Sequence, residues 1–393
     1  MWQVLVINKY ELDGRTVAVP VLWDRNNLLV EPITSLYLFH LVVKLGRSLN
    51  TVTNYATTLS ILLNEIERDP NIDGWQAMTE RNMWAFLEYK LHQERELSGS
   101  TIDQYSDRLK QFYEWAFDNG WLVARPQFSW TLSNETMLKI AKDKGVRKSN
   151  DPFSLYSQYI SEDEFLTMLR YKPCKKQFEI ERDDLILKLG YYSGFRAGET
   201  LDEYNISVKR INSAIKSATD NEASGFWLDI IGKGKNGGKV RTIYVPEHIT
   251  KQIQRFIDGT WKRTVPSGSD LLICKRSGDK LLNREHASKL FTKTVKNLIA
   301  NGELDQINGF ITNKNRHYHS LRHSYATNLA EYCRKNGLSQ QLVQDRLGHS
   351  DPDITKIYVH FNAILHKDTK TADELSSQLP IHLKNFVKES LDG

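Results

Sequence analysis

Cysteine is scarce in this chain of 393 residues, and long apolar runs are missing. The three cysteines, Cys174, Cys274 and Cys333, lie far apart and form no C-x-x-C pair, so neither a disulfide framework nor a zinc site is indicated. No run of about eighteen apolar residues is present to span a bilayer, and the N-terminal MWQVLVINKY lacks the features of a secretory signal. We therefore expect a cytoplasmic protein that does not contact a membrane.

Glycine and proline are also modest in number, at 22 and 10, which argues against a collagenous or disordered chain. Hydrophobic residues make up 40% and charged residues 26% of the sequence, as in ordinary globular proteins. The length is too great for one ordinary core and predicts about two or three domains.

Positive charge is unevenly distributed along the chain. Residues 1–130 contain 12 Lys and Arg against 16 Asp and Glu, whereas residues 131–393 contain 41 against 32. The second part would attract a polyanion such as DNA, although the same excess is also compatible with an ordinary solvated surface. Two basic clusters, KIAKDKGVRK at 139–148 and KGKNGGKVR at 233–241, favour the nucleic-acid interpretation.

The N-terminal residues have a strand pattern. Between residues 4 and 30, short β-favouring runs alternate with turn signals at Asp13-Gly14 and Asn26-Asn27, which predicts a β extension over residues 1–31. We expect it to fold onto the helical domain that follows, because it is small for a separate DNA-binding arm.

From residue 32 the apolar period changes to three or four, which predicts a helical domain over residues 32–130. The clearest stripes are Tyr55, Leu59, Leu62, Leu63 and Ile66, and then Ile102, Tyr105, Leu109, Phe112, Tyr113 and Ala116. Ser100 with Asp103 is the expected start of the second helix, and Asn119-Gly120 its expected end.

Residues 131–158 are rich in Ser, Asn, Lys and Asp, and we predict an interdomain linker there, followed by a domain over residues 159–393. A capping box at Ser161–Glu164 and the run RDDLILKLGYYSG predict helices, the second ending in a glycine turn. FWLDII at 226–231 and VRTIYV at 240–245 predict a β hairpin around a glycine-rich loop.

Four short motifs carry the chemistry of this second domain. In chain order they are GFRAGE at 194–199, IGKG at 231–234, HSLRH at 319–323, and LGHS at 347–350 followed nine residues after its histidine by Tyr358. Singly each motif is weak. As an ordered set, the arginine, lysine, H-x-x-R, histidine and tyrosine resemble the catalytic domain of the tyrosine recombinase or phage integrase family.

That resemblance implies a mainly α fold with a small β-sheet. It implies a helical core DNA-binding domain and a mixed α/β catalytic domain that form a clamp around DNA. The implied activity is site-specific recombination, in which DNA strands are cleaved and rejoined through a covalent 3′-phosphotyrosine. The implied partners are double-stranded DNA sites, a homo-tetramer on synapsed DNA, and accessory proteins. The apolar run after Tyr358 is expected to dock on a neighbouring protomer or to pack in cis.

The resemblance implies that Arg196 and Arg322 contact the phosphate. Their chemistry fits, because guanidinium stays protonated and its planar fork can hold two phosphate oxygens while charge builds on them in the transition state. An alternative for Arg196 is a structural ion pair with Glu199, which we expect to act as a brace and not as a catalyst.

Tyr358 is the implied nucleophile, and its phenol needs nearby cations or a proton acceptor to attack at neutral pH. The alternative is a core tyrosine. Gly348 is expected to end the preceding helix, so that His349 and Tyr358 lie on separate elements.

His319 and His349 are the implied partners of phosphate or tyrosine, with their roles left open. His317 and His323 receive no role. Lys233 is the implied donor of a proton to the leaving 5′ oxygen, with Lys235 and Lys239 as substitutes and a phosphate-contacting surface lysine as the alternative.

Neither a cofactor nor a metal is expected, because transesterification conserves the phosphodiester bond energy and the chain has no Walker-A or H-E-x-x-H motif. Two rival functions remain open at this point. One is a DNA-relaxing enzyme like type IB topoisomerases, and the other is a sequence-specific DNA-binding protein without catalysis.

Overall fold

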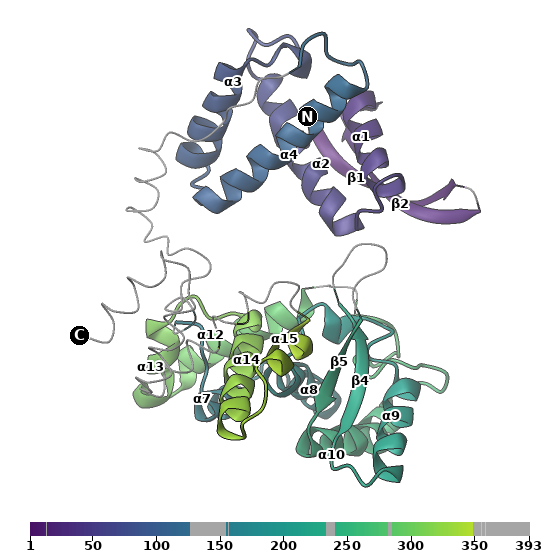
Figure 1. The fold of residues 1–393 in the computed structure, drawn as a ribbon, viewed down its shortest axis with the longest axis vertical. Coiled ribbons are helices and arrows are strands. Elements are labelled where there is room, and N and C mark those ends of the chain that lie inside the picture. Colours follow the sequence, from purple (N-terminus) through teal and green to yellow (C-terminus); the bar gives the residue numbers. More distant parts are fainter. Residues whose placement is uncertain are drawn as a thin grey trace. The chain divides into compact units, whose positions relative to one another are not determined.

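The computed structural model describes residues 1–12, 14–125, 155, 157–232, 240–281, 285–348, 355 and 358. These residues form two compact units, one at the N-terminal end of the chain and one from residue 155 on. They are mostly helical with two small sheets, as the sequence predicts. Figure 1 shows both units.

The first unit begins with an antiparallel sheet of strands β1 (Trp2–Leu12), β2 (Arg15–Asp24) and β3 (Leu29–Val30). The sheet packs against the first two helices and places Leu22 in their core. Asn64 fixes its edge, because the Trp2 backbone N–H donates to the side chain at 2.7 Å and the Trp2 carbonyl accepts from it at 2.9 Å. The predicted extension thus folds onto the helices.

The described part of this unit also has four α-helices, a 3₁₀ turn at Trp75–Ala77 and a π-helical segment at Phe86–Glu94. They are α1 (Pro32–Val43), α2 (Leu49–Ile66), α3 (Glu80–Ala85) and α4 (Gly99–Asp118). Both predicted apolar stripes lie on α2 and α4 and face one core, against which Tyr105 packs while only partly buried.

The predicted start of α4 is wrong by two residues. The helix begins at Gly99 and its N-cap is Ser98, whose hydroxyl oxygen accepts from the Thr101 N–H at 3.4 Å. Ser98 and Ser100 are both good N-cap residues, and sequence alone does not choose between them. The predicted end at Asn119 is confirmed.

The second unit is built around α8 (Gln177–Ser193), which contacts α10, α12, α14 and the second strand of a two-stranded sheet. Its other elements are α7 (Glu162–Leu169), the 3₁₀ turn η3 (Glu199–Leu201), α9 (Val208–Asp220), β4 (Phe226–Ile231), β5 (Val240–Val245), α10 (Glu247–Phe256), the π turn η4 (Ile257–Trp261), α11 (Lys262–Thr264), α12 (His286–Asn301), α13 (Leu304–Thr312), α14 (Tyr318–Lys335) and α15 (Gln341–Leu347).

Three local predictions for this unit are confirmed. Ser161 and Glu164 form the expected capping box at the start of α7. The helix α8 ends at Gly194 in a left-handed turn, and β4 and β5 pair antiparallel. The linker predicted over residues 131–158 falls almost wholly outside the described residues.

A small hydrophobic cluster lies between α14 and α15, apart from the main core of the unit. It contains Leu155, Ala326, Ala330, Cys333, Val343, Leu347 and Tyr358. All three cysteines of the chain are free.

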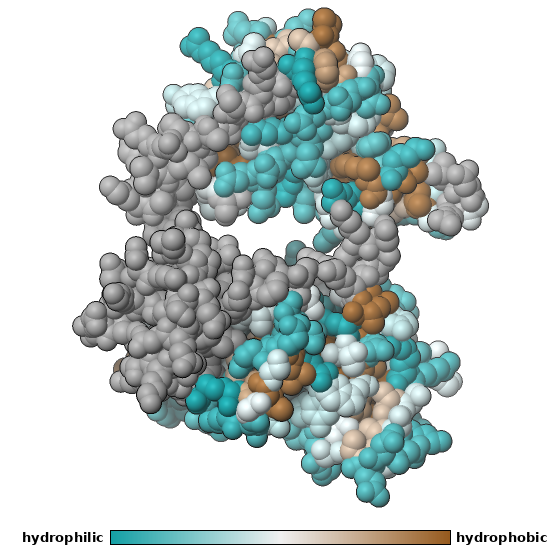
Figure 2. Space-filling view, viewed as in Figure 1, coloured by the Kyte–Doolittle hydropathy of each residue, from teal (hydrophilic) through white to brown (hydrophobic). Residues whose placement is uncertain are grey.

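Where Figure 2 colours the surface by hydropathy, hydrophilic residues predominate and the hydrophobic patches are small and separate. Among the described residues, no helix combines the length and hydrophobicity that a membrane crossing requires.

Candidate active site

The first predicted site residue, Arg196, follows directly on the end of α8. Gly194 closes that helix with φ of 67°, a conformation that favours glycine. A Cβ at this position would come within 2.5 Å of the Tyr325 ring on α14. The glycine therefore lets the chain turn sharply beside α14 and places Arg196 at the start of the turn that leads into η3.

Glu199 braces this turn, as expected. Its carboxylate accepts from the backbone N–H of Arg196 and from the Arg196 guanidinium, both at 2.7 Å. The structural ion pair considered as an alternative is therefore present. Because 29% of the Arg196 side chain is still exposed, the ion pair does not shut the guanidinium away from an incoming phosphate.

The same carboxylate also binds Arg241, an almost fully buried residue of β5 that the motif pattern does not include. The Arg241 guanidinium donates to the carbonyl oxygens of Arg346, at 2.5 Å, and Gly194, at 3.2 Å. Arg241 thus joins β5, the end of α8 and the end of α15. A sequence signal exists, because strand alternation puts Arg241 on the same inward face as Ile243 and Val245.

Arg322 lies on α14 and is 1% exposed. It donates to the Gly194 carbonyl at 2.6 Å and to the carbonyl of Leu347, the last residue of α15. Burial, together with the charges of Arg241 and Arg196, lowers the pKa of Arg322 to about 9. The guanidinium still carries its proton at neutral pH.

Three guanidinium groups therefore surround one carboxylate in this part of the structure. Burial would raise the pKa of Glu199, but Arg241 and Arg196 outweigh it and the pKa is lowered. Glu199 thus remains ionised and balances one of the three positive charges. The surplus positive charge in a largely desolvated setting favours an anion such as a phosphodiester.

Tyr358, the predicted nucleophile, is 5% exposed in the cluster between α14 and α15. Burial raises its pKa to about 12, and the charges of Arg322 and Arg196 oppose this rise. Its hydroxyl lies 2.8 Å from Nδ1 of His323. His323, to which the motif pattern gives no role, is thus a histidine in direct contact with the phenol.

His319 stands one helical turn before His323 on α14, and the two rings meet edge to face with centroids 4.6 Å apart. Burial and the neighbouring charges of Arg322, His317 and Arg196 lower the pKa of His319 to about 4. The imidazole is consequently neutral at physiological pH. The spacing of four residues, which places both rings on one helix face, is the sequence signal for His323.

Of the six predicted site residues, the fold brings Arg196, Arg322, His319 and Tyr358 together. Lys233 and its substitutes Lys235 and Lys239 lie outside the described residues, as does His349. Gly348 ends α15 in a left-handed conformation, as predicted, directly before His349.

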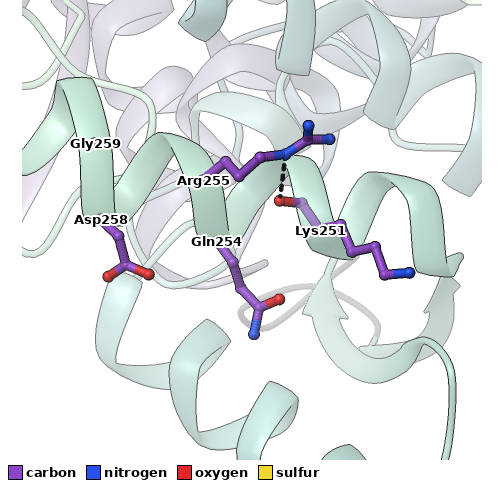
Figure 3. A pocket seen from close by; sticks show the side chains of 5 residues that line it. All are labelled: Lys251, Gln254, Arg255, Asp258 and Gly259. Carbon is purple, nitrogen blue, oxygen red and sulfur yellow. Dashed lines mark hydrogen bonds between the residues drawn. The ribbon is translucent and has the colours of Figure 1, made fainter.

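No group of His, Cys, Asp and Glu that could hold a metal ion occurs among the described residues. A shallow hollow on α10 and η4 is lined by Lys251, Gln254, Arg255, Asp258 and Gly259 (Figure 3). It contains none of the predicted site residues.

Comparison with known proteins matches both parts of the chain. Residues 158–363 match the phage integrase family, and residues 35–120 match the phage integrase N-terminal SAM-like domain. The chain belongs to the phage integrase family. Tyrosine recombinase XerD of Oceanobacillus iheyensis is 26% identical over 337 residues, which cover 84% of this chain and 94% of the relative. Tyrosine recombinase XerA of Pyrococcus furiosus is 28% identical over 198 residues, 50% of this chain and 56% of the relative.

Solved structures of the family share the fold. The XerH site-specific recombinase bound to its palindromic difH substrate aligns with a TM-score of 0.52 at 20% identity, over 83% of this chain and 81% of that one. The Tn1549 transposon integrase in complex with transposon right end DNA aligns with a TM-score of 0.54 at 16% identity, over 86% and 99%.

Proposed function

We propose that this protein is a site-specific DNA recombinase that cleaves and rejoins DNA strands through a covalent 3′-phosphotyrosine on Tyr358. The observation that carries the proposal is the position of that phenol, buried in its own chain within the electrostatic reach of the Arg322 and Arg196 guanidinium groups. Family membership and the tyrosine recombinase relatives support site-specific recombination.

In this mechanism Arg196 and Arg322 hold the non-bridging oxygens of the scissile phosphate. As the Tyr358 oxygen attacks phosphorus, negative charge grows on those oxygens and the fixed cations stabilise it. Loss of one such donor would raise the barrier by about 3 to 4 kcal/mol. Arg241 contacts no reacting atom and acts by positioning Glu199 and, through it, Arg196.

Neutral His319 suits donation of a hydrogen bond to a phosphate oxygen, and His349 is assigned the same kind of contact. Lys233 is assigned as the acid that protonates the leaving 5′ oxygen. The new phosphotyrosine bond preserves the phosphodiester's energy, so the 5′ hydroxyl of another strand can later displace Tyr358 without ATP.

The protein's partner in this proposal is a double-stranded DNA site, held between a helical domain at 32–130 and a catalytic domain at 159–393, with a linker at 131–158 and the sheet at 1–31 on the helical domain. The basic excess of the second part of the chain supports DNA binding. We further propose a tetramer on two synapsed sites in the cytoplasm, and a role in integration or transposition of a mobile element with accessory proteins.

The test is capture of the covalent intermediate. DNA bound by the purified protein is selected from a random duplex library, and the selected site is rebuilt as a nicked suicide substrate. Wild type forms a protein–DNA adduct that withstands denaturation. Tyr358→Phe binds the same DNA and forms none, because the nucleophilic oxygen is gone.

Tyr332→Phe is the matched control and retains adduct formation, because Tyr332 lies on α14 and is 56% exposed. If Tyr358→Phe still forms an adduct, another residue is the nucleophile. Specific binding without any wild-type adduct supports a non-catalytic DNA-binding protein. Relaxation of a supercoiled plasmid without exchange between two sites supports the topoisomerase alternative.

A further inference from the structure

The hydroxyl of Tyr358 has a defined partner on α14. Nδ1 of His323 lies 2.8 Å from it, within the range of a strong hydrogen bond, and the two ring planes are inclined by 32°. Ala326 and Ala330, three and seven residues after His323, are fully buried in the same cluster as the tyrosine ring. Small side chains on this helix face thus leave room for the ring, while His323 meets its oxygen.

We propose that His323 is a catalytic residue that accepts the phenol proton of Tyr358 during strand cleavage. This inference rests on the proposed function. With its own proton on Nε2, neutral His323 accepts a hydrogen bond from the phenol through Nδ1. As the Tyr358 oxygen–phosphorus bond forms and the bond from phosphorus to the 5′ oxygen breaks, the phenol proton passes to Nδ1. A separate acid protonates the 5′ oxygen. In rejoining, imidazolium returns the proton to the departing phenol oxygen.

The chemistry requires such an acceptor. Because burial raises the pKa of Tyr358 to about 12, its phenol is almost wholly protonated at pH 7. The charges of Arg322 and Arg196 do not offset this rise, so attack calls for a proton acceptor in contact with the hydroxyl, and His323 occupies that position.

His319, the other histidine of the motif, is a poor candidate for this step. Its ring lies beside His323, and the surrounding burial and positive charge disfavour protonation. The pair thus divides the work on one helix face, with His319 as a neutral donor to phosphate and His323 as the proton acceptor for tyrosine.

The experiment compares cleavage of two suicide substrates that carry the selected site, one ordinary and one with sulfur in place of the leaving 5′ oxygen. A thiolate leaves without protonation, so the sulfur substrate bypasses the need for a general acid but not for a general base. In His323→Asn the side chain remains polar, but an amide does not accept a proton near neutral pH. We expect this variant to cleave both substrates at least about a hundredfold more slowly than wild type. Lys233→Ala is the comparator. Because it lacks the proposed general acid, we expect the sulfur substrate to restore its rate of cleavage.

His323→Ala gives a second readout, because added imidazole can enter the space left by the half-buried ring and restore part of the rate. His248→Asn, at an exposed histidine of α10, is the matched control and cleaves like wild type. Cleavage by His323→Asn at the wild-type rate overturns the proposal, and faster cleavage assigns the contact an inhibitory role instead. If the sulfur substrate restores the cleavage rate of His323→Asn, His323 acts in protonation of the leaving oxygen, and the proposal is likewise overturned. Failure of wild type to form any adduct counts against the proposed function itself.

Discussion

Glu199 controls the charge of the candidate site. Its 5% exposed carboxylate is shared by Arg196 and Arg241, and Arg322 acts on it from farther away. Three guanidinium groups packed closely would repel one another, and each carries a desolvation cost. The ionised carboxylate offsets part of that repulsion and holds Arg196 in a fixed geometry, ready for a phosphate.

Replacement of Arg241 by methionine tests this arrangement. Methionine fills much of the same space but removes one of the two guanidinium groups in contact with the buried carboxylate and leaves the Arg346 carbonyl without its donor from Arg241. Breaking a buried pair in this way costs about 3 to 5 kcal/mol, so Arg241→Met lowers the free energy of unfolding by an amount of that order. Urea denaturation measures the loss, and the suicide substrate reports a matching fall in cleavage.

Arg255→Met is the control for that experiment. Arg255 is exposed on α10, and its guanidinium donates to the Lys251 carbonyl of the same helix at 3.2 Å (Figure 3). Its replacement changes stability by less than about 0.5 kcal/mol. Equal stability of the two variants would show that the buried arginine network contributes nothing.

The motif pattern reaches only part of this network. It points to Arg196, Arg322, His319 and Tyr358, which the fold brings together. It does not reach Arg241 or His323, because motif order says nothing about which face of β5 meets the end of α8, or which of two histidines on one helix face contacts the tyrosine. Those contacts depend on packing between segments that are distant in the sequence.

Secondary structure was more readily predicted where a local signal was unique. The capping box of α7, the glycine at the end of α8 and the β4–β5 hairpin all follow from residues within a few positions of the feature. The start of α4 does not follow from the sequence in this way, because Ser98 and Ser100 are both suitable N-cap residues. Ser98 prevails with Thr101, whose hydroxyl lies 2.8 Å from its own.

Gly194→Ala tests the turn that joins α8 to Arg196. Alanine in a left-handed conformation costs about 1 kcal/mol, and its Cβ would also displace the Tyr325 ring. Overpacking adds about 1 to 3 kcal/mol, so we expect a total loss of about 2 to 4 kcal/mol in denaturant unfolding, with reduced cleavage.

Gly337→Ala is the matched control for this turn. Gly337 has φ of 65° just after α14, and a Cβ there would meet nothing within 4 Å. Gly337→Ala therefore has the backbone strain without a clash, and we expect it to lose about 1 kcal/mol of unfolding free energy. If the two variants are equally stable, close packing against Tyr325 does not matter.

The two units have separate hydrophobic cores. Among the described residues, the buried members of the first core lie between Leu22 and Ala116, and those of the main second core lie between Ile160 and Leu321. The polar stretch after residue 130 and the length of the chain, which exceeds what one core holds, are the sequence features that predict more than one core. The sequence did not show that the N-terminal sheet contributes a buried residue, Leu22, to the helical core.

A fragment of residues 1–125 is therefore expected to fold alone. All the residues of its core that the structure describes lie within this range, and a domain of this size is typically stable by about 5 to 15 kcal/mol. We expect one cooperative urea transition by circular dichroism and dispersed amide resonances. A fragment of residues 32–125 lacks Leu22 and the strand that Asn64 holds at Trp2, so its helices expose core surface to water and it unfolds at lower urea. Equal urea midpoints for the two fragments would show that the sheet does not stabilise the helical core. A disordered 1–125 fragment would show that the helical core needs the rest of the chain.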